Sequence, residues 1–590
     1  MLPAMKPLES DAFLGVERSV TGRRWIGRLD ARGEGQALAI AQQTGLSELL
    51  ARVLAGRGVE PQDAQAFLDP TVRTLLPDPF KLTGMQEAAA RLADAVIRNE
   101  RVAIFGDYDV DGATSTALLT RYLRGCGLDP IVHIPDRIFE GYGPNVDAIR
   151  SFAEKGVTLL VTVDCGTTSI DTLEEAQKLG MEVVVIDHHQ ADEKLPRAIV
   201  VNPNRVDDLS GLGHLAAVGL VFVTLVALSR ELRQRNFWNA DRAEPDLLSS
   251  LDLVALGTIA DVVPLDANNR NLVSQGLKRI RAGRCATGIA ALMRAAGRAL
   301  AEVSSFDLGF VVGPRLNAAG RLADMSLGIE CLITEDEARA ANCAQELDRL
   351  NRERRDIEAS MLTQALAALE QASGTDGNTF FHPEWHQGVV GIVASRLKDR
   401  LHRPVICFAR AEEAGAMVLR GSGRSIAGLH LRDALDVVSK RAPGLIRRFG
   451  GHAMAAGLTI AAGDYERFAG EFERAVEEFL PPDARLRVVE TDGALDAMHF
   501  SLEVGRLLDA GIWGQGFPQP VFCDTFAVEN QRVVGERHLK LMLVKNGRRI
   551  EAMRFGALDP LPPQVRAAYR LSVNEFNGLK NIQLNVEHFE

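Results

Sequence analysis

Cysteine is scarce in this sequence, and no two cysteines form a Cys-x-x-Cys pair. The seven that occur stand singly along a chain of 590 residues. Zinc ribbons and the disulfide frameworks of small secreted proteins both need clustered cysteines, so this spacing excludes both classes. Scattered single thiols are typical of proteins in a reducing compartment, and we expect a cytoplasmic location.

Long apolar runs are also absent. The most apolar stretch, residues 216–228, spans about 13 residues, which is too short to cross a bilayer and predicts a buried helix. The first 20 residues carry charges throughout and contain no apolar core of the kind found in a signal peptide. We therefore expect no membrane among the partners of this protein.

An excess of positive charge is missing too, since the formal net charge is -11. This acidity excludes few functions. Contacts to phosphate groups need only local basic patches, and a site that binds divalent cations needs clustered carboxylates, which lower the total charge. A nucleic-acid-binding function is compatible with this composition.

The length of the chain predicts three or four domains, because one hydrophobic core does not extend over 590 residues. Apolar runs at residues 101–105, 158–163 and 182–186 predict buried strands, and residues 113–124 and 172–179 between them predict helices. Strands that alternate with crossover helices form a parallel α/β sheet.

The second half of the chain contains a long helix and a change of pattern. Thr334 and Glu337 form a capping box, and no glycine or proline follows until Gly374. This pattern predicts one helix of roughly 37 residues, about 55 Å long, which we interpret as a connector between two lobes. A second, smaller α/β unit is expected at about residues 378–475, with a strand at 404–408 and a Gly-rich segment at 421–428.

The C-terminal part of the sequence has hairpin signals. Asn546-Gly547 separates two strand-like runs, and Asn577-Gly578 separates two more. Asn-Gly is the strongest short signal for a two-residue hairpin turn. We expect a small antiparallel barrel of about 100 residues, of the OB-fold type.

Acidic residues and histidines concentrate where the predicted strands end. In chain order they are Asp107, Asp109 and Asp111 after the first strand, Asp164 after the second, Asp187, His188 and His189 after the third, and Asp261 after a later apolar run at residues 253–259. The carboxyl ends of parallel strands lie at one edge of a sheet, where open α/β folds bind ligands. We therefore expect four segments to converge on one crevice, and all these residues except Asp187 are candidate catalytic residues.

Such a dense group of carboxylates repels itself unless cations neutralise it. Aspartate and histidine without cysteine suit Mn²⁺ or Mg²⁺. Two such ions about 3.5–4 Å apart activate a water molecule and hold the phosphate oxygens, so the pattern predicts phosphoester hydrolysis. A single Asp after a strand is often only a helix N-cap, and a His-His pair is often only surface. The coincidence of four segments favours the metal site.

These residues resemble the motifs of the DHH phosphoesterase superfamily and, within it, of the RecJ family. The matching strings are residues 107–112, Asp164, residues 187–189 and Asp261, then 314–321, 385–391, 421–425 and 450–452, of which the last three belong to a companion DHHA1 domain. The resemblance runs from about residue 75 to the end. It implies an N-terminal segment (1–74), a parallel-sheet DHH domain (75–325), a long connector helix (326–375), a smaller α/β DHHA1 domain (376–478) and an OB-fold nucleic-acid-binding domain (479–590).

The resemblance also implies roles for single residues. It makes Asp109, Asp111, Asp164, His188 and Asp261 the metal ligands, with Asp164 as the bridge between two ions. Many relatives place a histidine where this chain has Phe105, and Asp107 is the candidate replacement. His189 is expected to contact the scissile phosphate.

The implied activity is 5′→3′ removal of mononucleotides from single-stranded DNA, in DNA repair and recombination. The implied partners are single-stranded DNA with a 5′ end, a single-stranded-DNA-binding protein and a helicase. An enzyme that starts at 5′ ends needs a pocket for the 5′-phosphate, and Arg137, Ser422 and Arg424 are candidates for it because guanidinium groups and Gly-flanked amides suit phosphate oxygens. The other candidate substrate-binding residues are Arg315, Asn317, Arg321, His386 and His452.

Several of these candidates have a structural alternative. Arg137 can be part of a surface ion pair instead. Residues 420–448 carry seven basic residues against two acids, a stripe that can guide a DNA backbone or simply be a solvated face. Trp385, Trp513 and Phe517 can stack on bases, but each can equally pack in a core.

Two other functions compete with the exonuclease. A DHH-family phosphodiesterase acting on oligoribonucleotides or small nucleotides needs only the two α/β lobes, whereas this chain adds a connector helix and a barrel. A non-catalytic DNA-binding scaffold of the same family should have lost metal ligands, and here each motif is intact.

Overall fold

The computed structural model describes residues 11–68, 70–71, 77–371, 377–413, 415–576 and 578–590. The chain forms two compact units. The parallel-sheet unit comprises Val59–Arg352 and Ala510–Gln519, and the barrel unit comprises Met1–Gly58, Glu353–Asp509 and Pro520–Glu590.

A five-stranded parallel sheet is the centre of the parallel-sheet unit. Its order is β3 (Ile131–His133), β2 (Val102–Gly106), β4 (Leu159–Val163), β5 (Glu182–Ile186) and β6 (Ile199–Val201). Strands β2 and β4 are buried along their whole length, as expected for strands that helices cover on both faces. The predicted parallel sheet and its three apolar strands are confirmed.

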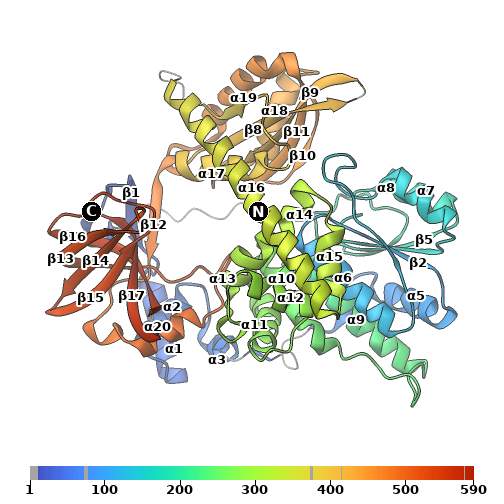
Figure 1. The fold of residues 1–590 in the computed structure, drawn as a ribbon, viewed down its shortest axis with the longest axis horizontal. Coiled ribbons are helices and arrows are strands. Elements are labelled where there is room, and N and C mark those ends of the chain that lie inside the picture. Colours follow the sequence, from blue (N-terminus) through green and yellow to red (C-terminus); the bar gives the residue numbers. More distant parts are fainter. Residues whose placement is uncertain (1–10, 69, 72–76, 372–376, 414, 577) are drawn as a thin grey trace. The chain divides into compact units, whose positions relative to one another are not determined.

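Helices cover both faces of this sheet (Figure 1). They are α7 (Val146–Glu154) and α8 (Ile170–Lys178) on one face, and α5 (Met85–Arg98), α6 (Val110–Gly125) and α9 (Ala217–Gln234) on the other. Phe105, Phe152 and Leu173 fill the core beneath the first pair. The apolar stretch at 216–228 is the buried helix that the sequence predicts.

The rest of the parallel-sheet unit is helical. Its elements are α10 (Leu251–Ala260), α11 (Ala267–Arg281), α12 (Thr287–Ala295), α13 (Ser305–Asp307), a π-helical turn (Leu308–Val312), α14 (Gly313–Leu322) and α15 (Ser326–Ile333). The expectation of a strand at residues 253–259 is therefore wrong, because this run lies inside α10. Residues 251–258 are all buried, and a run that is apolar on every side lacks the periodicity that distinguishes a helix from a strand.

The predicted long helix is present as α16 (Glu337–Gln371), which is 35 residues long. Its N-terminal cap differs from the prediction. The Asp336 side chain accepts the backbone N–H groups of Ala338 and Arg339 at 2.8 and 3.1 Å, while Thr334 ends α15. An Asp directly before a helix satisfies the free N–H groups of its first turn, so Asp336 replaces the expected Thr334–Glu337 box. Residues 372–376, at the predicted end of the connector, lie outside the described residues.

The barrel unit contains a second, mixed sheet. Its order is β10 (Ile446–Gly451), β11 (Ala455–Ala461), β9 (Ala416–Arg424), β8 (Val405–Glu413) and β7 (Thr379–Phe381), with helices α17 (Val390–Leu401), α18 (Leu431–Arg441) and α19 (Tyr465–Phe479). Only the β7–β8 pair among these strands is parallel. The predicted strand at 404–408 is the start of β8, and part of the Gly-rich segment forms the end of β9.

The C-terminal strands close into a barrel, as predicted. Its order is β13 (Phe522–Val534), β14 (His538–Lys545), β15 (Arg548–Arg554), β17 (Leu579–Phe589) and β16 (Gln564–Phe576). Asn546 and Gly547 form the β14–β15 turn, both with positive φ, as a type I′ hairpin requires. Strands β16 and β17 pair up to Phe576 and Leu579, and Asn577 of the second predicted turn lies outside the described residues.

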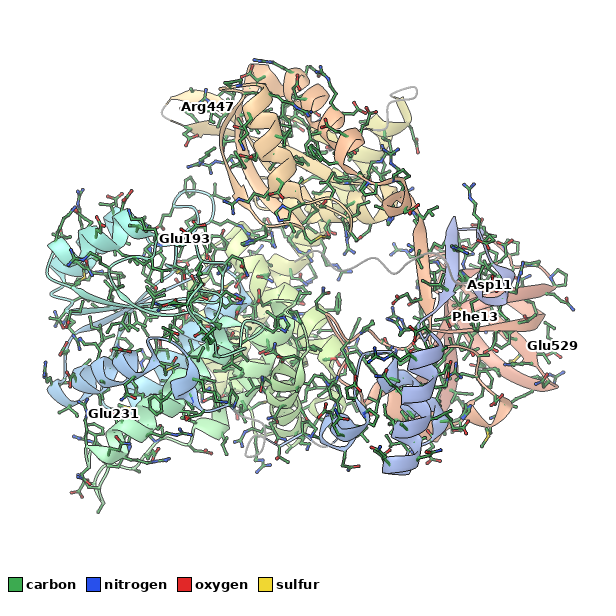
Figure 2. All side chains as sticks on the ribbon, turned by 180° about the vertical axis from the view of Figure 1, so that it is seen from behind. Asp11, Phe13, Glu193, Glu231, Arg447 and Glu529 are labelled. Carbon is green, nitrogen blue, oxygen red and sulfur yellow. The ribbon has the colours of Figure 1, made fainter. Side chains whose placement is uncertain are left out.

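The N-terminal segment, which has no readable motif, also belongs to the barrel unit. Its strand β1 (Arg23–Gly27) pairs in parallel with β12 (Arg487–Thr491), and Trp25 is fully buried in a core shared with the barrel. Phe13, labelled in Figure 2, packs against this core. Asp492 is buried and forms an ion pair with Arg57 at 2.7 Å. The helices α1 (Ala31–Thr44) and α2 (Glu48–Ala55) belong to the same unit, whereas α3 (Ala64–Leu68) already lies in the parallel-sheet unit.

Among the described helices, none combines the length and the apolar character needed to cross a bilayer. All seven cysteines are free thiols. The absence of a disulfide framework agrees with their single spacing in the sequence.

Candidate metal centre

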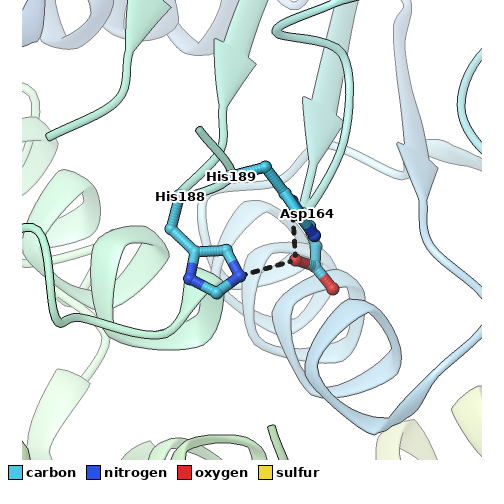
Figure 3. A group of neighbouring side chains, drawn as sticks. All are labelled: Asp164, His188 and His189. Atoms are coloured by element: carbon cyan, nitrogen blue, oxygen red, sulfur yellow. Dashed lines mark ion pairs between the residues drawn. The ribbon is translucent and has the colours of Figure 1, made fainter. Parts of the chain in front are cut away.

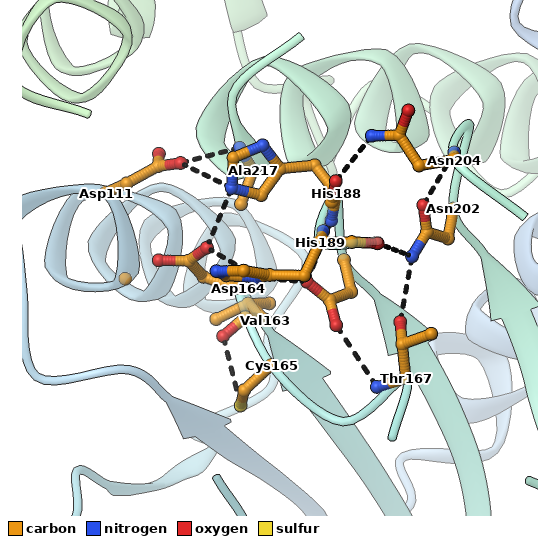
Figure 4. Close-up of polar contacts among 12 residues, drawn as sticks. Asp111, Val163, Asp164, Cys165, Thr167, His188, His189, Asn202, Asn204 and Ala217 are labelled. Carbon is orange, nitrogen blue, oxygen red and sulfur yellow. Dashed lines mark hydrogen bonds and ion pairs between the residues drawn. The ribbon is translucent and has the colours of Figure 1, made fainter. Parts of the chain in front are cut away.

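The first acidic loop connects β2 to α6 at the carboxyl edge of the parallel sheet. Asp109 is the N-cap of α6, and its Oδ1 accepts the backbone N–H of Gly112 at 3.0 Å. Asp111 is buried in the first turn of the same helix. Its two carboxylate oxygens accept the backbone N–H groups of Ala217 and Val218 at 2.6 and 2.9 Å, so it also anchors the start of α9 (Figure 4).

The second and third loops bring Asp164 and His188 together (Figure 3). His188 Nε2 lies 3.3 Å from Asp164 Oδ1, 3.6 Å from Asp261 Oδ2 and 3.9 Å from Asp111 Oδ2. Asp164 follows β4 directly and has a φ of 61°, an unusual backbone conformation for a residue other than glycine. Asp261 reaches the group from the C-cap of α10, so one of the four segments is a helix end and not a strand end.

Three overlapping groups of ligand atoms result. Within each group the atoms lie within 4.8 Å of one another, and the groups are Asp107, Asp109 and Asp164; Asp111, His188 and Asp261; and Asp164, His188 and His189. The structure thus brings together all seven candidate catalytic residues. Phe105, where many relatives of the resembling superfamily have histidine, is buried in the core on the α7–α8 face of the sheet.

Burial and mutual repulsion change the acidity of these carboxyl groups. Burial, and then the charge of Asp109, raises the pKa of Asp107. Burial and the charge of Asp261 raise the pKa of Asp111, and burial and the charge of Asp111 raise the pKa of Asp164. The pKa of Asp261 is raised as well, mainly by burial. Such a group is electrostatically unstable without positive charge beside it.

Three atoms of the group lack hydrogen-bond partners among the described residues, although they are buried. They are Asp107 Oδ1, Asp164 Oδ1 and His188 Nε2. Buried polar atoms almost always have partners, so three exceptions in one place point to a ligand that these atoms hold. Oxygen atoms with one imidazole nitrogen fit a divalent cation such as Mn²⁺ or Mg²⁺.

Cys165, next to Asp164, does not change this ligand type. Its thiol is buried and lies 3.5 Å from the carbonyl oxygen of Val163. Burial and the charges of Asp107 and Asp187 raise the pKa of the Cys165 thiol well above its usual value. Cys165 belongs to none of the three ligand groups found among the described residues, so the site offers oxygen and imidazole nitrogen.

Asp187 organises the loop after β5. Its Oδ1 accepts the backbone N–H of His188 at 2.8 Å and pairs with His189 Nδ1 at the same distance, while its Oδ2 accepts the backbone N–H of Thr167 at 3.1 Å (Figure 4). Burial lowers the pKa of His189, but the hydrogen bond and the charge of Asp187 outweigh it and raise that pKa to about 9. The same pair holds the pKa of Asp187 below its usual value against the effect of burial. The Asp187 side chain therefore favours the protonated form of His189.

Three residues that the sequence analysis missed support these loops. The Tyr142 hydroxyl donates to the carbonyl oxygen of Asp164 at 3.2 Å and lies 3.1 Å from His189 Nδ1. Asn202 and Asn204 donate to the carbonyl oxygens of His189 and His188 at 2.9 and 2.5 Å. Both asparagines follow β6, and the carboxyl end of this strand lies at the same edge of the sheet. Their position after an apolar strand is a sequence signal for a role at this edge.

Arg137, Asn317 and Arg321 belong to elements beside the first acidic loop. The Arg137 guanidinium lies 4.4 Å from the ring centre of Tyr108, and its charge acts on Asp107. Helix α14 approaches the loop so closely that a Cβ on Gly320 would lie 2.2 Å from the carbonyl oxygen of Tyr108. Asn317 and Arg321 flank that glycine on the helix. This proximity explains why the position holds glycine.

Arg315, by contrast, makes structural contacts. Its guanidinium pairs with Asp348 at 2.8 Å and donates to the carbonyl oxygen of Val311 at 2.7 Å. These contacts connect α14 to α16 within the parallel-sheet unit. They leave the predicted contact of Arg315 with substrate untested.

The remaining substrate-binding candidates lie in the barrel unit. Ser422 and Arg424 occupy β9, and the Arg424 guanidinium donates to Ser422 Oγ at 3.2 Å. His386 is half-buried, and its Nδ1 accepts the backbone N–H of Gly388 at 3.1 Å. His452 is exposed directly after β10. Four candidates of the barrel unit therefore lie on or beside its mixed sheet.

Other parts of the predicted DNA-binding surface are engaged elsewhere. Trp385 is buried and donates to Gln364 at 2.9 Å, and Trp513 stacks on the buried Phe517 at 5.6 Å, so these side chains are packed. In the basic stripe, Lys440 pairs with Asp436, Arg441 with Glu478 and Arg448 with Glu413. Arg447 is exposed on β10 (Figure 2). The stripe is therefore partly neutralised.

Three family models match the chain. The DHH family, N-terminal domain matches residues 101–258, the DHHA1 domain matches residues 364–478 and the RecJ OB domain matches residues 491–588. The first of these ranges contains the loops of Asp107, Asp164 and His188. The predicted order of DHH domain, DHHA1 domain and OB barrel is confirmed.

Relatives with curated names match over most of the chain. The single-stranded-DNA-specific exonuclease RecJ of Dickeya dadantii is 46% identical over 560 residues, which cover 92% of this chain and 96% of the relative. The protein of the same name from Escherichia coli is 44% identical over 559 residues with the same coverage.

Solved structures with a similar fold include RecJ from Thermus thermophilus. Its complex with Mn²⁺ has a TM-score of 0.79 at 32% identity, covering 96% of this chain and 79% of that chain. Its complex with Mg²⁺ has a TM-score of 0.73 at 30% identity, covering 96% and 78%. The fold is thus shared with proteins whose structures contain divalent cations.

Proposed function

The chain belongs to the RecJ family, and from this membership we propose that it is a metal-dependent exonuclease that hydrolyses single-stranded DNA from the 5′ end and releases 5′-mononucleotides. The observation that carries the proposal is the convergence of buried carboxylates and His188 on one sheet edge, with Asp107 Oδ1, Asp164 Oδ1 and His188 Nε2 lacking hydrogen-bond partners among the described residues. Two relatives, at 46% and 44% identity, are named single-stranded-DNA-specific exonucleases. DNA repair and recombination are the processes that need such an activity.

The ligands of two Mn²⁺ or Mg²⁺ ions are Asp109, Asp111, Asp164, His188 and Asp261, with Asp107 as a further candidate. The overlapping ligand groups support two ions, and Asp164, which belongs to two of the groups, supports the role of bridge. When bound, such ions lower the pKa of a water molecule and neutralise the phosphate oxygens. The raised pKa values of Asp107, Asp111 and Asp164 support the same conclusion, because cations relieve the repulsion that raises them.

His189 orients and stabilises the phosphate. Asp187 pairs with His189 Nδ1 at 2.8 Å, and this pair raises the pKa of His189. A charged donor held in a fixed orientation favours a phosphate oxygen that gains negative charge during hydrolysis. The Tyr142 hydroxyl donates to the carbonyl oxygen of Asp164 and so helps to hold the loop after β4 in place.

Basic and polar residues in both units bind the strand. In the parallel-sheet unit, Arg137, Asn317 and Arg321 lie on elements beside the acidic loop, and Arg315 is the further candidate on α14. In the barrel unit, the Ser422–Arg424 pair on β9 is supported as a 5′-phosphate site by its donor groups, with His386 and His452 on neighbouring segments. A guanidinium next to a hydroxyl suits phosphate oxygens.

We propose the domain limits 1–74, 75–325, 326–375, 376–478 and 479–590. The free thiols support action in the reducing cytoplasm. An enzyme specific for single strands depends on other proteins to expose them. We therefore infer a helicase and a single-stranded-DNA-binding protein as partners.

The competing functions have less support. A phosphodiesterase for small nucleotides does not account for the 35-residue α16 or for the closed barrel. A scaffold without activity does not account for buried carboxylates with raised pKa values, which destabilise a fold that has no use for them.

The direct test is cleavage by the purified protein. Oligonucleotides of about 20 residues, labelled at the 5′ or the 3′ end, are offered as single-stranded DNA, duplex DNA and RNA, with Mn²⁺ and with EDTA. We expect 5′-mononucleotides from single-stranded DNA with Mn²⁺ and no product with EDTA. Release from the 3′ end, or equal cleavage of duplex DNA, would contradict the proposal.

A further inference from the structure

Two phenylalanine side chains are exposed together on the parallel-sheet unit. Phe306 lies in α13 and Phe310 in the π-helical turn that follows, and their side chains are 58% and 71% exposed. The rings are stacked with their centres 4.8 Å apart and an interplanar angle of 24°. Two large aromatic rings this exposed bury little surface in the protein, so the pair needs another explanation than core packing.

The helical run that carries the pair is fixed against the metal centre. Gly309, between the two rings, packs on α10 so closely that a Cβ there would lie 3.1 Å from Ile259 Cγ2. Ile259 is two residues before the candidate ligand Asp261. The same run continues into α14, whose Gly320 contacts the acidic loop at Tyr108. The segment that carries the aromatic pair therefore packs directly on α10, the helix that ends at the candidate ligand Asp261.

The segment is also rigid at its start. Ser304 and Asp307 form a reciprocal capping box, and Ser305 Oγ donates to the carbonyl oxygen of Trp513 at 3.0 Å. Arg281 donates to the carbonyl oxygen of Val303 at 2.7 Å. A π-helical turn is rare and is often found at functional sites. Here it holds Phe310 one turn after Phe306, on the exposed side.

The chain segment before this aromatic pair is rich in basic residues. Residues 267–301 contain seven basic residues and no acid, and the basic residues are Arg270, Lys278, Arg279, Arg281, Arg284, Arg294 and Arg298. Arg281 contacts the segment as described, and Arg298 Nε lies 3.5 Å from Asp307, next to Phe306. Arg284 and Arg294 are exposed on the same two-helix region. Basic groups with exposed aromatic rings are the combination that binds single-stranded nucleic acid.

We propose that Phe306 and Phe310 form a stacking platform for bases of the single strand that lie beyond the nucleotides at the metal centre. This inference rests on the proposed function and adds to it a binding surface for the single strand. The platform takes bases of any sequence, because every base has a flat apolar face, while Arg284 and Arg294 attract the phosphates. An acidic protein segment is the other occupant that such a surface suits, but the rigid connection to α10 and α14 favours the DNA strand.

The test separates binding from cleavage. The variant Phe306→Ala/Phe310→Ala is compared with wild type for binding of 5′-phosphorylated dT20 in EDTA, where hydrolysis cannot occur, by fluorescence anisotropy. We expect binding to weaken about 5- to 20-fold, as the loss of stacking on one or two bases predicts. Turnover of 5′-phosphorylated dT3 with Mn²⁺ should stay within about twofold of wild type, because so short a substrate does not reach the platform.

Two further variants and one modified oligonucleotide test whether the loss of base stacking causes the weaker binding of dT20. Phe306→Tyr/Phe310→Tyr should restore binding of dT20, and Phe479→Ala, which removes an exposed phenylalanine of the barrel unit, should leave it unchanged. A 20-mer with abasic sites after the third nucleotide should bind wild type more weakly than dT20, with a smaller difference for the Ala variant. Melting temperatures check that the exposed substitutions leave the fold intact.

Unchanged binding of dT20 by the Ala variant overturns the platform and leaves the surface to a protein partner. An equal loss of dT3 turnover also overturns it, because the pair would then be part of the centre itself. These outcomes differ from failure of the proposed function, which is seen when wild type with Mn²⁺ cleaves neither dT20 nor dT3.

Discussion

The carboxylate centre of the parallel-sheet unit and the Ser422–Arg424 site of the barrel unit are built in opposite ways. In the centre, buried acids repel one another, and atoms such as Asp164 Oδ1 have no hydrogen-bond partner among the described residues. On β9, the Arg424 guanidinium is half-exposed and already hydrogen-bonded to Ser422 Oγ and to the carbonyl oxygen of Gly423. The first arrangement needs a ligand to be stable, whereas the second is stable by itself.

This difference indicates which ligand each site holds. A buried cluster with raised pKa values is suited to cations that stay bound, because their loss restores the repulsion. A partly solvated guanidinium binds an anion with little reorganisation and releases it easily. An exonuclease needs both properties, since its metal ions remain while the 5′ end changes with each nucleotide removed.

The largest effect is expected when Asp164, the candidate bridge between the two ions, is replaced. Asp164→Ala should reduce cleavage by about 10³-fold or more, because the ions lose their shared ligand. Binding of single-stranded DNA should remain within about threefold of wild type, since the basic residues are intact. Asp129→Ala, an exposed acid outside the centre, is the matched control and should cleave normally. Near-wild-type turnover by Asp164→Ala would remove its role as bridge.

A second experiment asks whether the cluster depends on cations for its stability. Mn²⁺ at about 100 times its Kd should stabilise the parallel-sheet unit by about 2.7 kcal/mol, measured by hydrogen exchange in β2 and β4. Asp164→Asn should lose this gain but be more stable than wild type in EDTA, because one buried like charge is gone. If wild type were equally stable with Mn²⁺ and with EDTA, the contrast between the two sites would not hold.

The third experiment addresses the barrel unit. Arg424→Ala should lower the preference for 5′-phosphorylated over 5′-hydroxyl ends about tenfold in kcat/KM, with the fold unchanged. Arg474→Ala, a basic residue on α19 that pairs with Glu471, should keep the preference. Equal losses on both kinds of end would exclude Arg424 from the 5′-phosphate site.

The smallest expected effect concerns a half-buried ionisable group that needs no ligand. Burial, with the charges of Arg23 and Arg554, lowers the pKa of His588 to about 4. The unfolded chain therefore takes up a proton below about pH 6.5 while the folded chain does not, so stability falls as the pH drops from 6.5 towards 4. At pH 5.5 the loss should be about 1 kcal/mol.

The variant His588→Gln, which keeps a hydrogen-bonding group for Thr21, should remove this loss of stability. Urea unfolding of the barrel at pH 7.5 and 5.5 measures it. A parallel decline of wild type and variant between the two pH values would show that other groups cause the acid sensitivity. Cleavage at neutral pH should not change, because the substitution lies far in sequence from every candidate ligand.

Much of the centre could be predicted because its loops follow strands that the sequence identifies clearly. β2, β4 and β5 are short, apolar and bounded by polar turns. Asp107 and Asp164 come directly after β2 and β4, and His188 is the second residue after β5. Parallel strands then require these residues to meet at one edge. The position of Asp261 was expected for the wrong reason, since the preceding apolar run is the buried helix α10.

Other features could not be predicted because they depend on contacts between distant segments. Trp25 and β1 take part in the barrel core through β12, more than 400 residues later, and no local pattern indicates this pairing. Trp385 and Phe517 are suitable for base stacking by residue type alone, but packing decides their role. Asp336 replaced Thr334 as the cap of α16, because several neighbouring polar residues can cap a helix and the sequence does not rank them.

The left-handed backbone at Asp164 restricts which residues can occupy this position. Glutamate would preserve the charge, but its longer chain is poorly tolerated at a φ of 61°, and glycine would accept that φ but provide no carboxylate. Asparagine accepts the φ but carries no negative charge. Aspartate alone among the common amino acids meets both demands, so the shape of the main chain selects the ligand as strictly as the chemistry of the ion does.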